Sequence, residues 1–246
     1  MIWNGKQTLN VTAAILAAGL LLPSPAAAQG VNQQFQIPDG CNGFLTVQSR
    51  SCTVSHYWTC EADPAGTHWR VALDEEGAYY LSFVDAEFRW LRSFNLRRGN
   101  NDTLIEPEND PASLSELLET GSDTMVFSIQ EESAQGTFQR DYTGYDRLTG
   151  GVISIDGIEL EITEFAYQWE TGNGPRETEG NQFVSRDLRL FFGGVETVTL
   201  PSGDTVEVDY SPVEFAQPGE AGYLATQPLY DCGDMMSGWP NQGDAG

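Results

Sequence analysis

The amino-acid sequence predicts a mainly β protein, an antiparallel meander of about ten to twelve strands with one short helix. Apolar and polar side chains alternate along most of the chain beyond residue 40, which is typical of strands that bury one face. Short turn signals separate these runs. Such a meander can form a barrel, a half-barrel or a sandwich. Because no internal repeat or linker divides the chain, we expect a single β-rich domain over residues 29–246.

The first predicted strands form a hairpin. Residues 44–49 and 53–60 alternate in polarity on either side of a turn near Arg50. Further strands of the same kind are predicted at residues 68–73, 79–83 and 88–96.

One short helix interrupts the strands. It begins either at Asp110, with a proline at its first position, or at Ser113, where Glu116 would complete a capping box. Gly121 is expected to end it. Its apolar face consists of Leu114, Leu117 and Leu118.

Two polar stretches are predicted to lie outside the strands. Residues 98–110 are rich in Asn, Asp and Glu and form the clearest loop in the sequence. Residues 143–151 contain three glycines and are expected to be a turn-rich connection between strands.

The later strands include one change of apolar phase. Apolar side chains face one way over residues 158–162 and the other way over residues 165–169, so a β-bulge is expected near Thr163 or Glu164. Another hairpin is predicted between residues 198–200 and 206–208.

Four cysteines predict two disulfides in an exported chain. The first hairpin brings Cys41 opposite Cys60. Cys52 and Cys60 are separated by an extended segment of about 26 Å, which is too long for a bridge. We therefore expect the pairs Cys41–Cys60 and Cys52–Cys232.

Residues 1–28 are predicted to be a secretory signal peptide that is removed from the mature chain. Lys6 supplies the positive charge, residues 11–22 form an apolar run, and residues 26–28 form an Ala-x-Ala cleavage site. The run is shorter than the about 20 residues that a membrane span needs. We expect no stable membrane span and a periplasmic or extracellular location.

The mature chain is strongly acidic. Because Lys6 is the only lysine, 11 arginines stand against 36 Asp and Glu residues, which gives a net charge of −25. Nucleic acid binding needs a basic face that releases counterions from phosphates, so nucleic acid is excluded as a partner. We interpret the charge as a source of solubility. The sequence does not predict an oligomeric state.

Two histidines stand next to aromatic residues in predicted strands. His56 and His68 would need a third ligand to hold a metal ion, and no suitable ligand accompanies them. The sequence therefore favours two ordinary strand histidines and predicts no metal and no cofactor.

Two arginines fall on faces that otherwise carry apolar side chains. Arg92 is in phase with the apolar residues of the stretch 88–96, and Arg186 with those of the stretch 184–192. A charge that faces a β-core is costly unless it is paired, and Asp85 is a candidate partner. One interpretation is a buried or rim-located Arg–Asp pair. In the functional interpretation, Arg92, Arg186 and Asp85 line an apolar cavity and hold the acidic head group of a lipid-like ligand.

Three functional hypotheses follow from these patterns. The first is a periplasmic binding module for an apolar or amphipathic small molecule; the meander resembles lipocalin-like and periplasmic lipoprotein-carrier architectures, but it carries no signature motif of either. The second is an envelope structural or protein-interaction module without catalytic activity. The third is a hydrolase that uses carboxylates or His56. The sequence favours a non-enzyme and predicts no catalytic residue, because no nucleophile, metal cluster or cofactor loop stands out.

Overall fold

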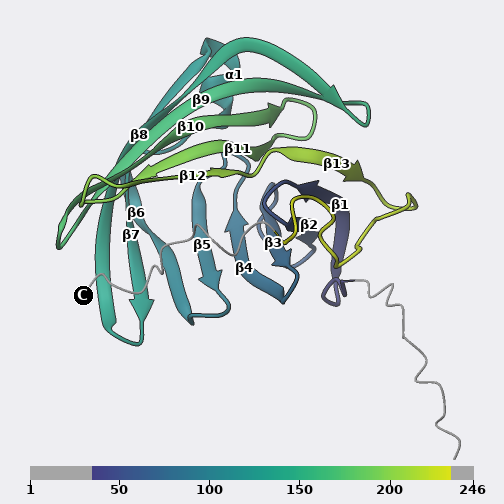
Figure 1. Cartoon of the computed structure of the whole chain (residues 1–246), viewed down its shortest axis with the longest axis horizontal. Coiled ribbons are helices and arrows are strands. Elements are labelled where there is room, and N and C mark those ends of the chain that lie inside the picture. The colour runs from purple at the N-terminus through teal and green to yellow at the C-terminus, as the bar shows by residue number, and fades with distance from the viewer. Residues whose placement is uncertain (1–34, 234–246) are drawn as a thin grey trace, which may run out of the picture. The chain divides into compact units, whose positions relative to one another are not determined.

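The computed structural model describes residues 35–233, which belong to the unit Asn32–Gly246. The predicted signal peptide, residues 1–28, lies outside the described residues. The mainly β class and the single short helix are confirmed, and the described part contains 13 strands, one more than predicted. In chain order (Figure 1) the elements are β1 (Cys41–Ser49), β2 (Thr53–Cys60), β3 (His68–Asp74), β4 (Gly77–Val84), β5 (Trp90–Asn95), β6 (Asn100–Asp110), α1 (Leu114–Thr120), β7 (Ser122–Ser133), β8 (Gly136–Ile155), β9 (Ile158–Thr171), β10 (Gly174–Ser185), β11 (Leu190–Thr199), β12 (Thr205–Asp209) and β13 (Pro212–Ala216).

All the strands form one antiparallel meander sheet, in which sequence neighbours pair from β1 to β12. β13 departs from this order and pairs with β1. β12 and β13 therefore occupy opposite edges of the sheet, although only Tyr210 and Ser211 separate them in the chain. A sheet whose edges are joined by two residues has to curl. The edges are not hydrogen-bonded to each other, so the sheet is not closed.

The curl places β9, β10 and β11 between two other layers. On one side, Leu45 of β1 and Phe215 of β13 pack against β9–β11 in the main core, where the Phe215 and Phe192 ring centroids are 5.0 Å apart. On the other side, Leu114 and Leu117 of α1 pack against the sheet. In Figure 1, α1 is drawn behind β8 and β9, and β1 and β2 lie below the long strands.

A second apolar cluster covers the opposite face of β2 and β3. Phe35 and Ile37, which precede β1, pack against it. Its buried members are Val54, Trp58, Val71 and Leu73.

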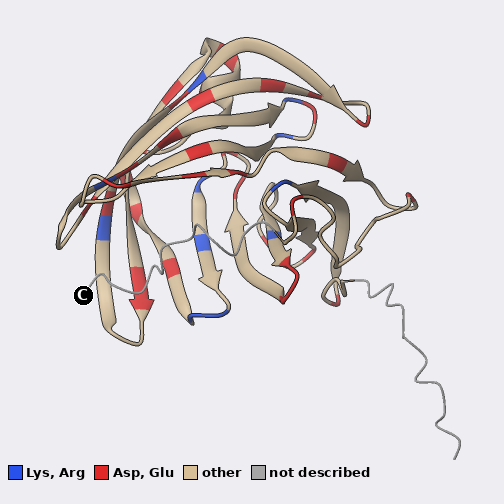
Figure 2. Cartoon of the chain, in the orientation of Figure 1, with Lys and Arg blue, Asp and Glu red and all other residues tan. Residues whose placement is uncertain are grey.

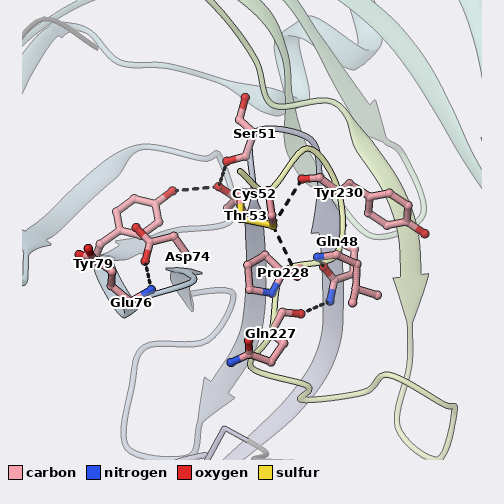
Figure 3. Close-up of a disulfide and its surroundings, with 12 residues drawn as sticks. Gln48, Ser51, Cys52, Thr53, Asp74, Glu76, Tyr79, Gln227, Pro228 and Tyr230 are labelled. Atoms are coloured by element: carbon pink, nitrogen blue, oxygen red, sulfur yellow. Dashed lines mark hydrogen bonds between the residues drawn. A yellow bond between two sulfur atoms is a disulfide. The ribbon is translucent and has the colours of Figure 1, made fainter. Parts of the chain in front are cut away.

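Two disulfides join Cys41 to Cys60 and Cys52 to Cys232, the pairing expected from the sequence. Cys41 and Cys60 are opposite each other in the β1–β2 register. Cys52 lies in the turn after β1 and holds the C-terminal segment against the hairpin (Figure 3). Gln48 of β1 strengthens this attachment, since its side-chain amide donates to the Gln227 carbonyl at 3.0 Å.

The helix α1 begins at Ser113 rather than at Asp110. The Ser113 hydroxyl accepts a hydrogen bond from the Glu116 backbone N–H at 3.1 Å, which is one half of the predicted capping box. The other half is not formed, because the Ser113 N–H has a different acceptor. The Ser113 N–H donates to the carboxylate of Asp123 in β7 at 2.8 Å. Gly121 ends the helix with a φ of 90°, as predicted, because this left-handed conformation suits glycine.

Both stretches that were predicted to be irregular contain strands. Residues 100–110 form β6, which pairs with β5 and β7. Every residue of β6 is at least partly exposed, and the strand has no apolar alternation that the sequence could reveal. Residues 143–151 belong to β8. A Cβ at Gly144 would lie 2.7 Å from the Cβ of Tyr167, its partner on β9. This glycine therefore allows the two strands to pack closely and does not form a turn.

The prediction of a β-bulge near Thr163 or Glu164 is wrong. The β9–β10 ladder runs through both residues without a shift. The irregularity lies in β8, where three residues between Leu148 and Val152 are opposite Ile162. The apolar phase changes in β9 for a different reason: its first residues face the main core, and its later residues face the side on which α1 packs.

The two disulfides are expected to contribute unequally to stability. Cys52–Cys232 spans 180 residues and Cys41–Cys60 spans 19, and a longer closed loop removes more conformational entropy from the unfolded chain. We expect Cys52→Ser/Cys232→Ser to lower the free energy of unfolding by about 5 kcal/mol and Cys41→Ser/Cys60→Ser by about 3 kcal/mol. Guanidinium chloride denaturation of the two double variants measures this, and equal or reversed losses would contradict it.

Candidate functional site

A cavity of about 70 Å³ lies between α1 and the sheet. A water molecule needs roughly 10–15 Å³ of such space, so the cavity has room for several waters or part of a small ligand. Trp90 is 41% exposed at its wall, so the cavity opens to solvent on that side. Seven aromatic residues line it: Phe88, Trp90, Phe127, Tyr145, Phe165, Tyr167 and Phe191. The lining also includes five charged residues: Glu87, Arg89, Glu108, Asp123 and Asp146.

Three rings of this wall and two further rings lie together on one face of the sheet, and we call these five rings the aromatic floor. They are Trp90, Phe127, Tyr142, Tyr167 and Trp169. Phe127, Tyr142 and Trp169 occupy one register row of β7, β8 and β9. The centroids of Phe127 and Tyr142 are 5.0 Å apart, and those of Tyr142 and Trp169 are 5.3 Å apart. We call the face that carries these rings the cavity face.

Burial shifts the pKa values of several groups on the cavity face. Burial raises the pKa of Tyr142 to about 12 and raises the pKa of Tyr167 as well. Burial also raises the pKa of Glu196, a β11 residue, to about 7. Groups of this kind resist ionisation because the charged form loses hydration.

Two carboxyl groups face each other in the cavity. Asp123 of β7 and Asp146 of β8 are directly opposite in the register, and both line the cavity. Burial raises the pKa of Asp146 to about 7, and the charge of Asp123 adds to this shift. Burial likewise raises the pKa of Asp123 to about 6, although the hydrogen bond from the Ser113 N–H opposes the shift. Near neutral pH the pair therefore retains a proton that an exposed aspartate has lost.

An arginine at the rim of the cavity forms ion pairs with three carboxylates. Arg89 pairs with Asp85 at 2.7 Å, with Glu106 at 3.1 Å and with Glu108 at 3.2 Å. Its hydrogen bond to Asp85 is the main cause of its raised pKa. Because three anions already occupy this guanidinium, we assign it a structural role at the rim.

The structure does not bring Arg92, Arg186 and Asp85 together, and none of them lines the cavity. Asp85 pairs with Arg89. Arg186 lies one residue beyond the end of β10, where it is exposed, pairs with Glu161 at 2.5 Å and donates to a carbonyl of α1. Asp85 is thus paired with Arg89 instead of with Arg92 or Arg186, and Arg186 is paired with Glu161.

Arg92 misses the cavity because the pairing of β4 with β5 shifts next to it. Arg92 lies opposite Phe83, on the side of the second apolar cluster, and is exposed. The shift occurs between Arg92 and Trp90. Trp90 consequently reaches the cavity, although the sequence placed both residues in one phase.

The two histidines project from opposite faces of the sheet. Trp58 and Trp69 are register partners, so His56 shares their face and His68 lies on the other. Burial lowers the pKa of each to about 4, so both are neutral at neutral pH. Among residues 35–233, the one group of potential metal ligands that lies close together is Cys52, Glu75 and Cys232, whose sulfurs form a disulfide.

Comparison of the chain with protein-family models, with curated proteins and with solved structures gives no match. The site is therefore interpreted from its own geometry. Within the described residues, no helix has the length and apolar character of a membrane span.

The carboxyl pair makes stability depend on pH. Both pKa values lie above the ordinary 3.8, so the pair contributes most to stability below about pH 4, and this contribution is lost as the pH rises through 6 to 7. We expect Asp146→Asn to raise the free energy of unfolding at pH 8 by about 2 kcal/mol and to have little effect at pH 4. Urea denaturation followed by circular dichroism measures both values.

Asp141 provides the matched control on the same strand. It is exposed, and hydrogen bonds from Ser128 and Gln139 lower its pKa. Asp141→Asn should therefore leave stability at pH 8 unchanged or slightly lower. If Asp146→Asn behaves as Asp141→Asn does, the carboxyl pair is not buried as described.

Proposed function

We propose that this chain is an exported binding protein that holds an amphipathic small molecule in the cavity beneath α1. The observation that carries the proposal is the continuity between the cavity wall and the aromatic floor, which offers a long apolar contact surface. Folded interiors rarely contain voids larger than a water molecule. An aromatic-walled space with a few convergent polar groups is the usual form of a ligand pocket.

Two further features support an exported, periplasmic or extracellular location. Two disulfides fit an oxidising compartment. The leader at residues 1–28 has the charge, apolar run and cleavage pattern of a secretory signal.

Filling part of the cavity should weaken the binding. Met125 of β7 lines the cavity and is partly covered, so Met125→Trp would place a larger side chain in the space. We expect this variant to bind the neutral fluorescent probe N-phenyl-1-naphthylamine about tenfold more weakly than the wild type, as measured by fluorescence titration.

Val152→Trp is the control, since Val152 is 54% exposed and lies outside the cavity lining. Its affinity for the probe should equal that of the wild type, and thermal unfolding establishes that both variants are folded. The proposal is overturned if the wild type does not bind the probe or if folded Met125→Trp binds it as well as the wild type.

The pair Asp123–Asp146 favours a second candidate, carboxylate-based hydrolysis in the same cavity, because paired carboxyls with raised pKa values can act as acid and base. Release of nitrophenolate from p-nitrophenyl dodecanoate separates the two functions. A binding protein leaves this ester intact. Turnover that Asp146→Asn abolishes would favour the hydrolase.

A further inference from the structure

One arginine on the cavity face has no anionic partner. Arg176 of β10 lies opposite Trp169 in the register, and its guanidinium carbon is 5.4 Å from the centre of that ring. Its Nε is buried and has no hydrogen-bond partner. No carboxylate among residues 35–233 forms an ion pair with it.

Most arginines of the described residues differ from Arg176 in this respect, since seven of the 11 form ion pairs with carboxylates. The sequence has 36 Asp and Glu residues against 12 Lys and Arg, and Figure 2 shows acidic residues spread over the strands. Two other partly covered arginines are satisfied: Arg140 pairs with Glu131 at 2.5 Å, and Arg70 donates to the Ser55 hydroxyl at 3.1 Å. The buried Nε of Arg176 lacks an acceptor, which costs free energy, and the rest of this partly exposed guanidinium is accessible to one from outside the chain.

Arg140 adds a second positive charge near Arg176. Arg140 lies on the cavity face two residues before Tyr142, and Tyr142, Trp169 and Arg176 follow one another across β8, β9 and β10 in one register row. Burial lowers the pKa of Arg176, and the charge of Arg140 lowers it further. An anion bound at Arg176 would relieve this repulsion.

The aromatic floor connects Arg176 with the cavity. From Trp169 the ring contacts lead to Tyr167 at 5.8 Å and from Tyr167 to Trp90 at 5.9 Å, where the cavity begins. The far end of this path carries Asp123 and Asp146, which disfavour an anion there. These charges therefore favour one orientation of an amphipathic anion, with its head group at Arg176 and its apolar end in the cavity.

We propose that Arg176 binds the anionic head group of a long-chain monocarboxylate, whose apolar chain lies along the aromatic floor and ends in the cavity beneath α1. This assignment rests on the proposed binding function and specifies the ligand class and its orientation. The guanidinium supplies charge-assisted hydrogen bonds to the head group, and the rings supply apolar contact to the chain.

Three probes with the same chain test the assignment on the mature protein: dodecanoate, dodecanol and dodecyltrimethylammonium. Calorimetric titration should give dodecanoate the highest affinity, about tenfold above dodecanol. Arg176→Gln should weaken dodecanoate binding about 10-fold to 100-fold and leave dodecanol binding unchanged. Arg176→Lys, which keeps the charge, should retain part of the preference for dodecanoate.

Arg147→Gln is the matched control. Arg147 also lies over an aromatic ring, that of Tyr145, but it is exposed and pairs with Glu164. The variant Arg147→Gln should leave the affinities for all three probes unchanged. We also expect Arg176→Gln to be at least as stable to urea as the wild type, because it removes a covered charge that has no partner in the chain.

The outcomes separate the two proposals. Binding of dodecanol without any preference for dodecanoate, or an equal loss for both probes in folded Arg176→Gln, overturns the role of Arg176 and leaves the cavity function standing. A marked loss of stability in Arg176→Gln also overturns it, because Arg176 would then be structural. Failure of the wild type to bind any of the three probes overturns the binding function itself.

Discussion

A two-residue connection between the edge strands, which we call the crossing, determines the curvature of this sheet. Tyr210 and Ser211 carry the chain from β12 at one edge to β13 at the other, so the intervening strands have to curl until the edges meet. Hydrogen bonds secure the crossing on both sides: the Tyr210 N–H donates to the Gly194 carbonyl at 2.8 Å, and the Arg50 N–H donates to the Ser211 carbonyl at 3.0 Å. The packed core and the cavity both follow from this curl, because it places β9–β11 between α1 and the first hairpin.

Burial of the middle strands on both faces explains the chemistry of the site. Leu160 and Phe165 of β9 are both buried, although they point to opposite faces of the strand. Near α1 the cavity face combines aromatic rings with the carboxyl pair Asp123–Asp146, whereas farther along β8 and β10 it carries Arg140 and Arg176. An anionic head group is favoured at the arginine end, and an apolar chain is favoured along the rings between the two ends.

Sequence patterns predicted the fold class, the first hairpin, the helix and both disulfides, because each rests on local alternation or on chain geometry. They failed where a strand has polar side chains on both faces, as in β6, or is buried on both faces, as in β9. The cavity residues Asp123 and Asp146 were missed because their meeting depends on the β7–β8 register, which no local pattern reveals. The sequence did not predict a role for Arg176, because no alternation of apolar side chains surrounds it.

The meeting of the two edges also affects how the protein behaves beside other copies of itself. An open strand edge is a template on which a second chain can add a strand, and long, flat edges promote aggregation. Here both edge strands are only 5 residues long, and β12 ends where the connection to β13 begins. β13 also contacts β11, the neighbour of the other edge strand. Edges this short offer few backbone groups to a second chain, which limits self-association through the backbone.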